Sequence, residues 1–329
     1  MEKLRWGIVG PGNIARKFAA AAKNLKDEVE LVAVASRGLE KAEAFAAEFG
    51  IPHAFGSYEE MAASPLVDCV YIATLHPFHK PSAELFLNAG KHVLCEKPIC
   101  VNAGEARALR EVARKNGVFL MEAMWTTFLP STRALLDFVR EGGIGDVLGL
   151  TADFCYSMTP AEDSRVFRND LAGGALLDVG VYTLHFAAML LGFAIDSLSA
   201  EARIVNNTDA HTQVSILYTT GAIASLSSAT MVNKPEDAVI YGSKGYIRVP
   251  CFFGASGFTV VKDGKEEWHD HPFLGNGFEE EILETTRAVR AGKTESDTHP
   301  LDLSIAVLEQ MDEIRYIIGL SYPADEDYE

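Results

Sequence analysis

A glycine-rich turn near the N-terminus constrains the fold of this chain more than any other stretch. Gly10–Ala15 reads G-x-G-x-x-A and follows a short apolar run over 4–9, and apolar residues then recur at helical spacing. We therefore expect a strand, a tight turn and a helix, the context in which such glycines bind a dinucleotide. An ordinary strand-to-helix turn can have the same glycines, so later features of the sequence must distinguish it from a dinucleotide-binding turn. The residues expected to contact the nucleotide here are Gly10, Gly12, Asn13 and Ile14.

Strand and helix patterns alternate through the first half of the chain. Strands are predicted over 4–9, 30–37, 67–74, 92–95 and 118–122, with helical patterns between them. This alternation predicts an α/β Rossmann domain with a doubly wound parallel sheet over 1–123. Ligands of such sheets bind beyond the carboxyl ends of the strands. The residues expected to line that crevice are Gly10, Arg37, Thr74, Lys97 and Glu122.

The end of the second predicted strand indicates which dinucleotide binds. An acidic residue at this place accepts hydrogen bonds from the ribose of NAD, whereas this chain has Ser36 and Arg37. A hydroxyl and a guanidinium suit a 2′-phosphate, which an acid would repel. We therefore expect NADP to be preferred, with NAD possible. A solvated loop arginine is the alternative interpretation of Arg37.

Lys97 is the most informative polar residue of this domain. It directly follows a buried strand and lies between Glu96 and Pro98, and the proline favours an extended backbone there. Glu96 is expected to position the cofactor or Lys97. His76 and His79, in the loop after the third strand, are candidate cofactor contacts, and a structural role is equally compatible with the sequence of that loop.

The pattern changes after residue 123. Short alternating strands with tight turns predict an α+β domain over 124–329 with a largely antiparallel open sheet. Within it, an apolar helix is expected from Asp178, and Tyr182 lies four residues on, so the two side chains would share a face. A helix-capping aspartate and a core tyrosine are the alternative interpretation.

Composition excludes several classes of protein. The 29 basic and 46 acidic side chains give a formal charge of −17, which argues against broad binding to nucleic acids or anionic membranes. The five scattered cysteines, without C-x-x-C spacing, indicate neither a disulfide framework nor a metal site and favour a reducing cytoplasm. The N-terminal apolar run is too short for a signal peptide, and no later run was expected to reach the length of a membrane span.

Four segments together resemble the glucose-fructose oxidoreductase, inositol dehydrogenase and MocA (Gfo/Idh/MocA) family. They are the glycine motif, Glu96-Lys97-Pro98, Asp178-x-Gly180-x-Tyr182 and the C-terminal run from Glu281-Ile282 to Arg315. Within the family, Met121–Thr126 and Gly173–Asp178 are most similar to dimeric dihydrodiol dehydrogenases and NADP-dependent D-xylose dehydrogenases. Thr127 and the segment 168–170 depart from the pattern of these relatives, which leaves the substrate open.

The resemblance implies an oxidoreductase in which Lys97 and Tyr182 are catalytic, Asp178 is the supporting acid, and the open sheet face forms a homodimer or higher homo-oligomer. A lysine ammonium beside a tyrosine favours the phenolate, which can take the hydroxyl proton while the nicotinamide takes the hydride. The substrate would be a sugar or a cyclic diol. Candidate aromatic walls of its pocket are Trp125, Phe154, Tyr156 and Phe167, each of which core packing would also explain. An NADP-binding sensor without turnover and a scaffold without cofactor are alternatives.

Overall fold

The computed structural model describes residues 2–161 and 164–326, which form two compact units. The first unit contains the residues up to Cys100 together with Gly104–Trp125 and Leu274–Ser304. The second contains Val101–Ala103, Thr126–Phe273 and the residues from Ile305 onward. Each unit has its own sheet, and the two sheets carry different parts of the candidate site.

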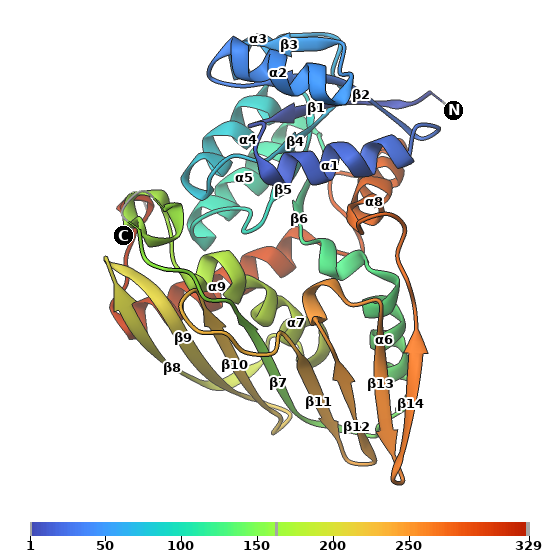
Figure 1. Cartoon of the computed structure of the whole chain (residues 1–329), viewed down its shortest axis with the longest axis vertical. Helices are drawn as coiled ribbons and strands as arrows, with labels where there is room; N and C mark the ends of the chain where they lie inside the picture. The colour runs from blue at the N-terminus through green and yellow to red at the C-terminus, as the bar shows by residue number, and fades with distance from the viewer. Residues whose placement is uncertain (1, 162–163, 327–329) are drawn as a thin grey trace. The chain divides into compact units, whose positions relative to one another are not determined.

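A six-stranded parallel sheet with the order β3-β2-β1-β4-β5-β6 forms the centre of the first unit. Both faces of this sheet are covered by helices (Figure 1). The arrangement is the doubly wound fold that the alternating pattern predicts. The strands are β1 (Leu4–Val9), β2 (Val29–Ala35), β3 (His53–Phe55), β4 (Cys69–Ile72), β5 (His92–Glu96) and β6 (Leu120–Ala123). The helices are α1 (Asn13–Asn24), α2 (Leu39–Phe49), α3 (Tyr58–Ala62), α4 (His79–Asn88), α5 (Ala103–Asn116) and α8 (Phe278–Arg290), with the short turn η1 (His76–Phe78). The short turn η2 (Trp125–Phe128) begins at Trp125 of this unit, and its other residues belong to the second unit.

Aromatic packing fixes helix α1 against this sheet. The ring of Phe18 on α1 stacks on Tyr71 of β4 at 4.0 Å, and Trp6 of β1 lies 5.3 Å from the same phenyl ring. All three side chains are fully buried. Because large aromatic side chains bury much apolar area, this contact holds the N-terminus of α1 at the end of β1. Helix α8 packs beside α1, although it comes from a distant part of the sequence.

An eight-stranded mixed sheet with the order β14-β13-β12-β11-β7-β10-β9-β8 forms the second unit. Only β7 and β10 pair in parallel, and all other neighbours are antiparallel. Helix α7 packs on β7 and β10, so the middle of one sheet face is covered. The strands are β7 (Val147–Cys155), β8 (Ile195–Val205), β9 (Thr208–Tyr218), β10 (Ile223–Ala229), β11 (Ala238–Gly242), β12 (Gly245–Val249), β13 (Gly257–Lys262) and β14 (Lys265–Asp270). The helical elements are α6 (Pro130–Arg140), η3 (Arg165–Phe167), η4 (Asn169–Leu171), η5 (Leu176–Gly180), α7 (Val181–Leu191), η6 (Phe252–Gly254), η7 (Pro323–Asp325) and most of α9 (Leu301–Ile318).

The fold class agrees with the sequence prediction, but local details differ. The short elements β3 and α3 were not predicted, because three and five residues carry too little periodicity. Asp178 lies in the π-helical turn η5, and regular α-helix begins only at Val181. The predicted division at 123/124 lies near a break between units, whereas the structure groups 274–304 with the first unit.

The run Asn169–Leu191 corrects one expectation about membrane spans. It is 23 residues long with a mean hydropathy of 1.6, so by length and composition it qualifies as a candidate span. However, 83% of its apolar window is buried inside the protein. Packing against the sheet of the second unit therefore explains its apolar character.

Candidate active site

The glycine turn between β1 and α1 has the geometry expected of a phosphate-binding loop. Gly10 has a φ of +85°, and a Cβ at this position would lie 3.0 Å from the Ala73 carbonyl oxygen. Beside Gly12, by contrast, a Cβ would have no neighbour closer than 4.0 Å. Gly12 precedes the first residue of α1 and offers no side-chain cap. The N-terminal N–H groups of α1 are therefore the intrinsic anion-binding end of a helix beside open space.

A cavity of about 640 Å³ lies at this turn, within the first unit. It contains the predicted residues Gly10, Gly12, Ser36, Arg37 and Thr74 in one lining. The structure thus brings together residues that follow β1, β2 and β4, as the doubly wound fold requires. The size and position of the cavity fit the adenosine end of a dinucleotide.

Sequence reasoning missed further side chains of this cavity, among them Lys41, Tyr58 and the acidic Glu59. Lys41, from the first turn of α2, lines it together with Arg37, and Tyr58 of α3 does so as well. The Arg37 guanidinium carbon lies 5.5 Å from the ring centre of Phe78, a cation–π distance. Lys41 follows Arg37 by four residues, a spacing that was available in the sequence. Tyr58 was not accessible to that reasoning because α3 itself was not predicted.

Buried polar groups fix the backbone around Lys97. The Lys97 N–H donates to Glu96 Oε2 at 3.2 Å, and the Tyr71 hydroxyl donates to Glu96 Oε1. Glu122 accepts the Ile99 N–H at 2.9 Å. Burial raises the pKa of Glu96, while the neighbouring Lys97 ammonium opposes that shift. The contacts of Glu96 therefore support its role in positioning Lys97.

His79 holds two loops of the first unit together. Its Nδ1 lies 2.8 Å from the Pro98 carbonyl oxygen and its Nε2 lies 3.1 Å from the Thr74 carbonyl oxygen. Burial lowers the pKa of His79, and the two carbonyl contacts work in the opposite direction. The imidazole of His76 is also buried, edge-on to His79 at 5.8 Å. These contacts support the structural interpretation of His79, and cofactor contact by either histidine stays a prediction.

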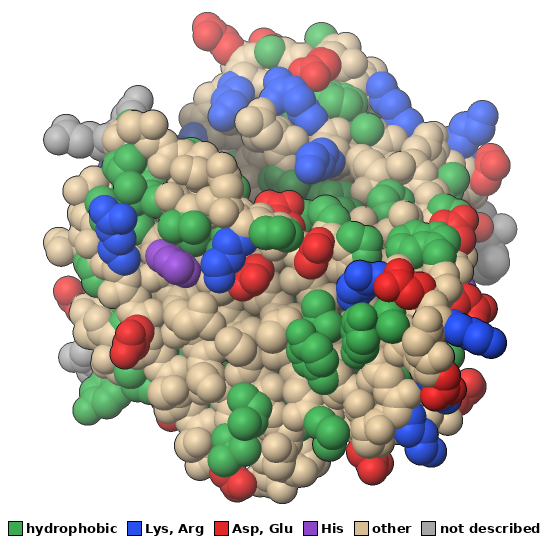
Figure 2. Space-filling view, turned by 60° about the horizontal axis from the view of Figure 1, so that its bottom comes forward, with side chains coloured by type: hydrophobic (Ala, Val, Ile, Leu, Met, Phe, Trp, Pro, Cys, Tyr) green, Lys and Arg blue, Asp and Glu red, His purple; other side chains and the backbone are tan. Residues whose placement is uncertain are grey.

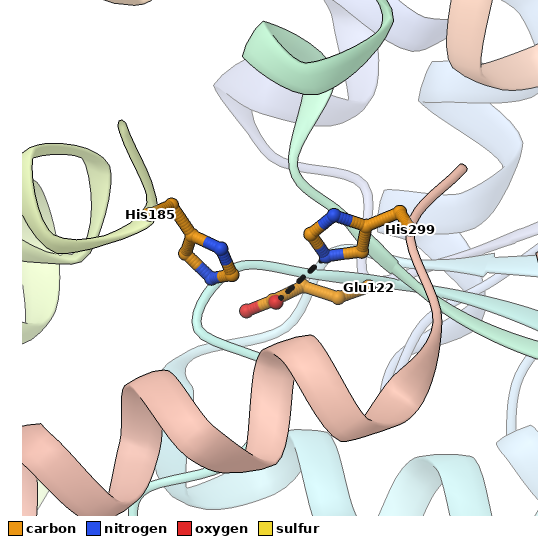
Figure 3. Close-up of side chains that lie close together, drawn as sticks. All are labelled: Glu122, His185 and His299. Atoms are coloured by element: carbon orange, nitrogen blue, oxygen red, sulfur yellow. Dashed lines mark hydrogen bonds and ion pairs between the residues drawn. The ribbon is translucent and has the colours of Figure 1, made fainter. Parts of the chain in front are cut away.

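Glu122 takes part in a second buried network behind the Lys97 segment. Its Oε2 accepts a hydrogen bond from the Ser304 hydroxyl at 2.6 Å. The same carboxylate oxygen lies 3.2 Å from His299 Nε2 (Figure 3). Both side chains of the His299–Glu122 pair are almost fully buried. Glu122 therefore connects the segment after Lys97 to His299, which precedes α9, and to Ser304 in the first turn of α9.

In the second unit, Asp178 is the centre of a hydrogen-bonded network. Its Oδ2 accepts the Tyr156 hydroxyl at 2.9 Å, and its Oδ1 accepts an N–H of Arg165 at 2.9 Å. Burial and the Asp178 carboxylate raise the pKa of Tyr156, so this phenol keeps its proton. The sequence did not indicate Arg165 as a site residue, because nothing in its neighbours or spacing predicts an ion pair with Asp178, which lies 13 residues further along the chain.

Tyr182 lies in an aromatic cluster of the same unit. Its ring centre lies 5.3 Å from that of Phe154 and 5.8 Å from that of Phe253, and the two phenyl rings stack at 3.9 Å. Phe154 is only partly buried. The cluster therefore provides an aromatic surface next to the proposed base, and Phe253 is a member that the sequence did not reveal.

Phe167 and Trp125 have other surroundings. Phe167 is 2% exposed and packs in a hydrophobic cluster with Val166 and Ala210, which supports the core-packing interpretation. Trp125 is in the first unit, where its ring lies 5.4 Å from that of Phe278. Their roles as substrate contacts stay predictions.

Comparison with known proteins identifies the family. Residues 4–124 match the family described as "Oxidoreductase family, NAD-binding Rossmann fold", and residues 132–248 match the "GFO/IDH/MocA C-terminal domain". The chain is 38% identical over 334 residues to a trans-1,2-dihydrobenzene-1,2-diol dehydrogenase of Mus musculus, covering 98% of this chain and 99% of the mouse protein. The chain belongs to the Gfo/Idh/MocA family of oxidoreductases.

Other members of the Gfo/Idh/MocA family agree with this assignment. The Homo sapiens trans-1,2-dihydrobenzene-1,2-diol dehydrogenase is 36% identical, with 98% of this chain and 99% of the human protein covered. A 3-ketoreductase from Actinomadura kijaniata, crystallised with NADP and TDP-benzene, superposes with a TM-score of 0.86 at 26% identity, covering 96% of this chain and 98% of that one. The protein is thus an NAD(P)-dependent oxidoreductase whose first unit is the dinucleotide-binding Rossmann fold.

The predicted site residues fall into two groups. The first unit contains the glycine turn, Ser36, Arg37, Thr74, the two histidines and Lys97, whereas the second contains Asp178, Tyr182 and Phe154. In the first unit, five of the predicted residues line the cavity, namely Gly10, Gly12, Ser36, Arg37 and Thr74. The others are not in its lining: Asn13, Ile14, His76, His79, Glu96 and Lys97. In the second unit, Phe154 lies against Tyr182 in the aromatic cluster, and Asp178 is the centre of its own hydrogen-bonded network. The pairing of Lys97 with Tyr182 stays a proposal.

Proposed function

We propose that the protein is an NADP-preferring dehydrogenase or reductase for a secondary alcohol or ketone on a sugar or cyclic vicinal diol. The observation that carries the cofactor preference is the position of Arg37 and Lys41 in the lining of one cavity, with no acidic residue at the end of β2. Two cations suit a 2′-phosphate, which has up to two negative charges. The similarity to a dihydrodiol dehydrogenase and a 3-ketoreductase supports the substrate class.

Tyr182 is the proposed acid–base group. Two tyrosines lie near Asp178 in sequence or space, but the Tyr156 hydroxyl already donates to the carboxylate, which raises its pKa. A phenol in that state is a poor base. Tyr182, packed on Phe154, is therefore the better candidate to take a proton from a carbinol or return it to a ketone.

Lys97 is proposed to act on the Tyr182 phenol and the substrate oxygen. An ammonium near a phenol favours the phenolate and lowers its pKa, and it also donates a hydrogen bond to an alkoxide or carbonyl oxygen. The hydrogen bonds of Glu96, His79 and Glu122 fix the backbone on which Lys97 lies. NADP, when bound, supplies or accepts the hydride.

Aromatic side chains are proposed to form the substrate walls. The stacked rings of Phe154 and Phe253 would contact the apolar face of a sugar or diol ring, and Trp125 would contribute from the first unit. Asp178 would orient Tyr182 or a second substrate hydroxyl, with Arg165 and Tyr156 fixing its carboxylate. The π-helical geometry of η5 is typical of functional sites.

A substrate panel tests this function. Aldoses, polyols, cyclic diols and the corresponding ketones are assayed with NADP and NAD by the absorbance of the reduced nicotinamide, while NADPH binding is followed by intrinsic fluorescence. Turnover of at least one vicinal diol or sugar, with NADP ahead of NAD, is expected. Binding without turnover across the panel would favour the NADP-sensing alternative, and absence of binding would favour the scaffold alternative.

Two variants test the roles of the catalytic pair. Tyr182→Phe and Lys97→Met are each expected to lower kcat by about a hundredfold or more, the usual magnitude of a lost acid–base group, while NADPH still binds. Tyr316→Phe, on an 87% exposed side chain of α9, is the matched control for the lost hydroxyl and should retain full activity. Near-normal turnover in either catalytic variant would contradict the assignment.

We also propose that the open face of the second sheet forms a homo-oligomer in the cytoplasm. Ile223, Gly149 and Tyr241 lie side by side across β10, β7 and β11, and the first and third are exposed. An apolar row on a sheet face favours packing against a second copy. The free state of all five cysteines supports a reducing compartment.

A further inference from the structure

Asp209, which is outside the proposed catalytic residues, has a buried carboxyl group that contacts the start of the segment containing Asp178 and Tyr182. Asp209 of β9 is fully buried. Its Oδ2 accepts the Leu176 N–H at 2.7 Å and the Thr212 hydroxyl at 2.7 Å. Leu176 is the first residue of η5, which continues directly into α7. Asp209 therefore satisfies a backbone donor at the start of the segment with Asp178 and Tyr182, where helical N–H groups lack partners within the helix.

The loop before η5 is fixed from a second side. Gly174 has a φ of +122°, and a Cβ there would collide with Asp209 Oδ1 and lie 3.1 Å from the Tyr322 hydroxyl oxygen. That hydroxyl donates to the Gly173 carbonyl at 2.5 Å. The backbone of Gly173 and Gly174 thus passes between Asp209 and Tyr322 without room for any side chain. A small movement of Asp209 would be transmitted to η5, because closely packed groups move together.

The other oxygen of Asp209 is poorly solvated. Oδ1 is buried without a hydrogen-bond partner among residues 2–161 and 164–326. Burial raises the pKa of Asp209 to about 7, against the opposing effect of Thr212 and the backbone N–H groups. The Tyr322 phenol faces Asp209, and burial, followed by the charge of Asp209, raises the pKa of Tyr322 well above its ordinary value, against the opposing effect of Arg315. Near neutral pH, Asp209 therefore exists in both protonation states.

We propose that Asp209 is a positioning residue for the reaction proposed above, anchoring the first turn of the Asp178–Tyr182 segment more firmly when its carboxyl group is protonated. The physical reason is linkage. When the loop opens, water reaches Oδ1 and the carboxyl ionises at its ordinary, lower pKa, so a rise in pH favours the open loop. The kinetic part of the proposal rests on the proposed function, whereas the anchoring part does not.

Hydrogen exchange measured by mass spectrometry tests the anchor without an activity assay. Peptides covering 173–184 are followed from about pH 5.5 to 8.5, with intrinsic exchange rates divided out. We expect protection in the wild type to fall by about tenfold or more across this range, because the folded-state pKa lies within it. Asp209→Asn should show no such pH dependence, and Asp209→Ala should have low protection throughout. The exposed Asp196→Asn on β8 is the control and should match the wild type.

The proposal that Asp209 is the anchor would be wrong if protection in the wild type did not change with pH. It would also be wrong if protection changed in parallel in the wild type and Asp209→Asn. Thr212→Val removes one donor to Oδ2 and leaves the carboxyl group in place, so it should retain the pH dependence of protection. This variant tests the anchor even if the Asp209 variants do not fold.

Kinetics then test the positioning role. Asp209→Ala should lower kcat about tenfold or more, with NADPH affinity unchanged because the cavity lies in the first unit. An unchanged kcat despite lost protection would overturn the positioning role. If the wild type turns over no sugar or diol, the proposed function fails, and the exchange profiles alone decide whether Asp209 is the anchor.

Discussion

Arg37 is the residue on which the cofactor preference depends. It lines the cavity beside the glycine turn, and its guanidinium lies over Phe78. Arg37→Ser is expected to weaken NADP binding by about 10- to 100-fold, the range for a lost charge-assisted hydrogen bond, and to change NAD binding little. Fluorescence titration with both reduced cofactors measures this. Lys115→Ser, at an exposed position on α5, is the control, and an equal loss of NADP and NAD affinity in Arg37→Ser would contradict the assignment.

Glu281 on α8 is a second residue whose charge state matters. It is fully buried, and neither carboxyl oxygen has a partner among the described residues. Burial, with a smaller effect of Glu96, raises the pKa of Glu281 well above its ordinary value. The folded protein thus holds a proton that the unfolded chain has lost, so the stability from this group is complete at low pH and falls as pH rises through the folded-state pKa.

Glu281→Gln should reduce this loss, because the amide is always neutral. The difference in melting temperature, Glu281→Gln minus wild type, should be larger at pH 9 than at pH 6 by about 2–4 °C or more. This corresponds to about 1 kcal/mol in the free energy of unfolding. Glu280→Gln, at the neighbouring and more accessible position, should show a constant difference from the wild type. Thermal unfolding followed by circular dichroism at several pH values tests this prediction. Parallel curves of melting temperature against pH for the wild type and Glu281→Gln would refute it.

At the scale of elements, the β1–α1 unit shows why a glycine is needed at one position. Gly10→Ala would combine an unfavourable positive φ with a contact 3.0 Å from the Ala73 carbonyl oxygen. We expect NADPH affinity to fall at least about tenfold, because the turn must move away from the N-terminus of α1. Gly50→Ala separates the effect of the positive φ from that of the close contact. Gly50 has a φ of +72°, but a Cβ there would have no neighbour within 4 Å. It should lower stability slightly and leave NADPH binding unchanged. Similar affinities in the two variants would show that the Ala73 contact is unimportant.

At the scale of the whole molecule, the proposed homo-oligomer would form through the open face of the second sheet. Acidic and basic side chains are interspersed on the face drawn in Figure 2, so the charge of −17 does not form a block of one sign there. Ile223 is 53% exposed on the open sheet face, which is a high value for a β-branched apolar residue in a strand. Ile223→Asp is expected to shift an oligomer toward the single-chain mass in light scattering. Leu274→Asp, 52% exposed in the first unit, is the control and should leave the mass unchanged. A wild type that is already a single chain at micromolar concentration would contradict the oligomer.

The sequence by itself determined the fold class and the cofactor class. Strands and helices of ordinary length have a periodicity that a short stretch of sequence reveals, and the strand predicted over 4–9 coincides with β1. The glycine turn, Ser36 and Arg37 could be placed around one cavity because a doubly wound sheet brings the carboxyl ends of its strands to one edge. These features are local, or follow from one topological rule.

Only the tertiary structure decided what the buried polar side chains do. His79 bonds to the Pro98 carbonyl, Asp178 to Arg165 and Asp209 to Leu176, and each contact joins segments that are separate in the sequence. The hydrophobic periodicity of the sequence does not predict such contacts, because they depend on how distant strands and loops pack and on which polar groups are removed from water. The Gly10 turn was predicted from sequence alone, whereas the anchor at Asp209 became visible only once β9 and η5 were packed together.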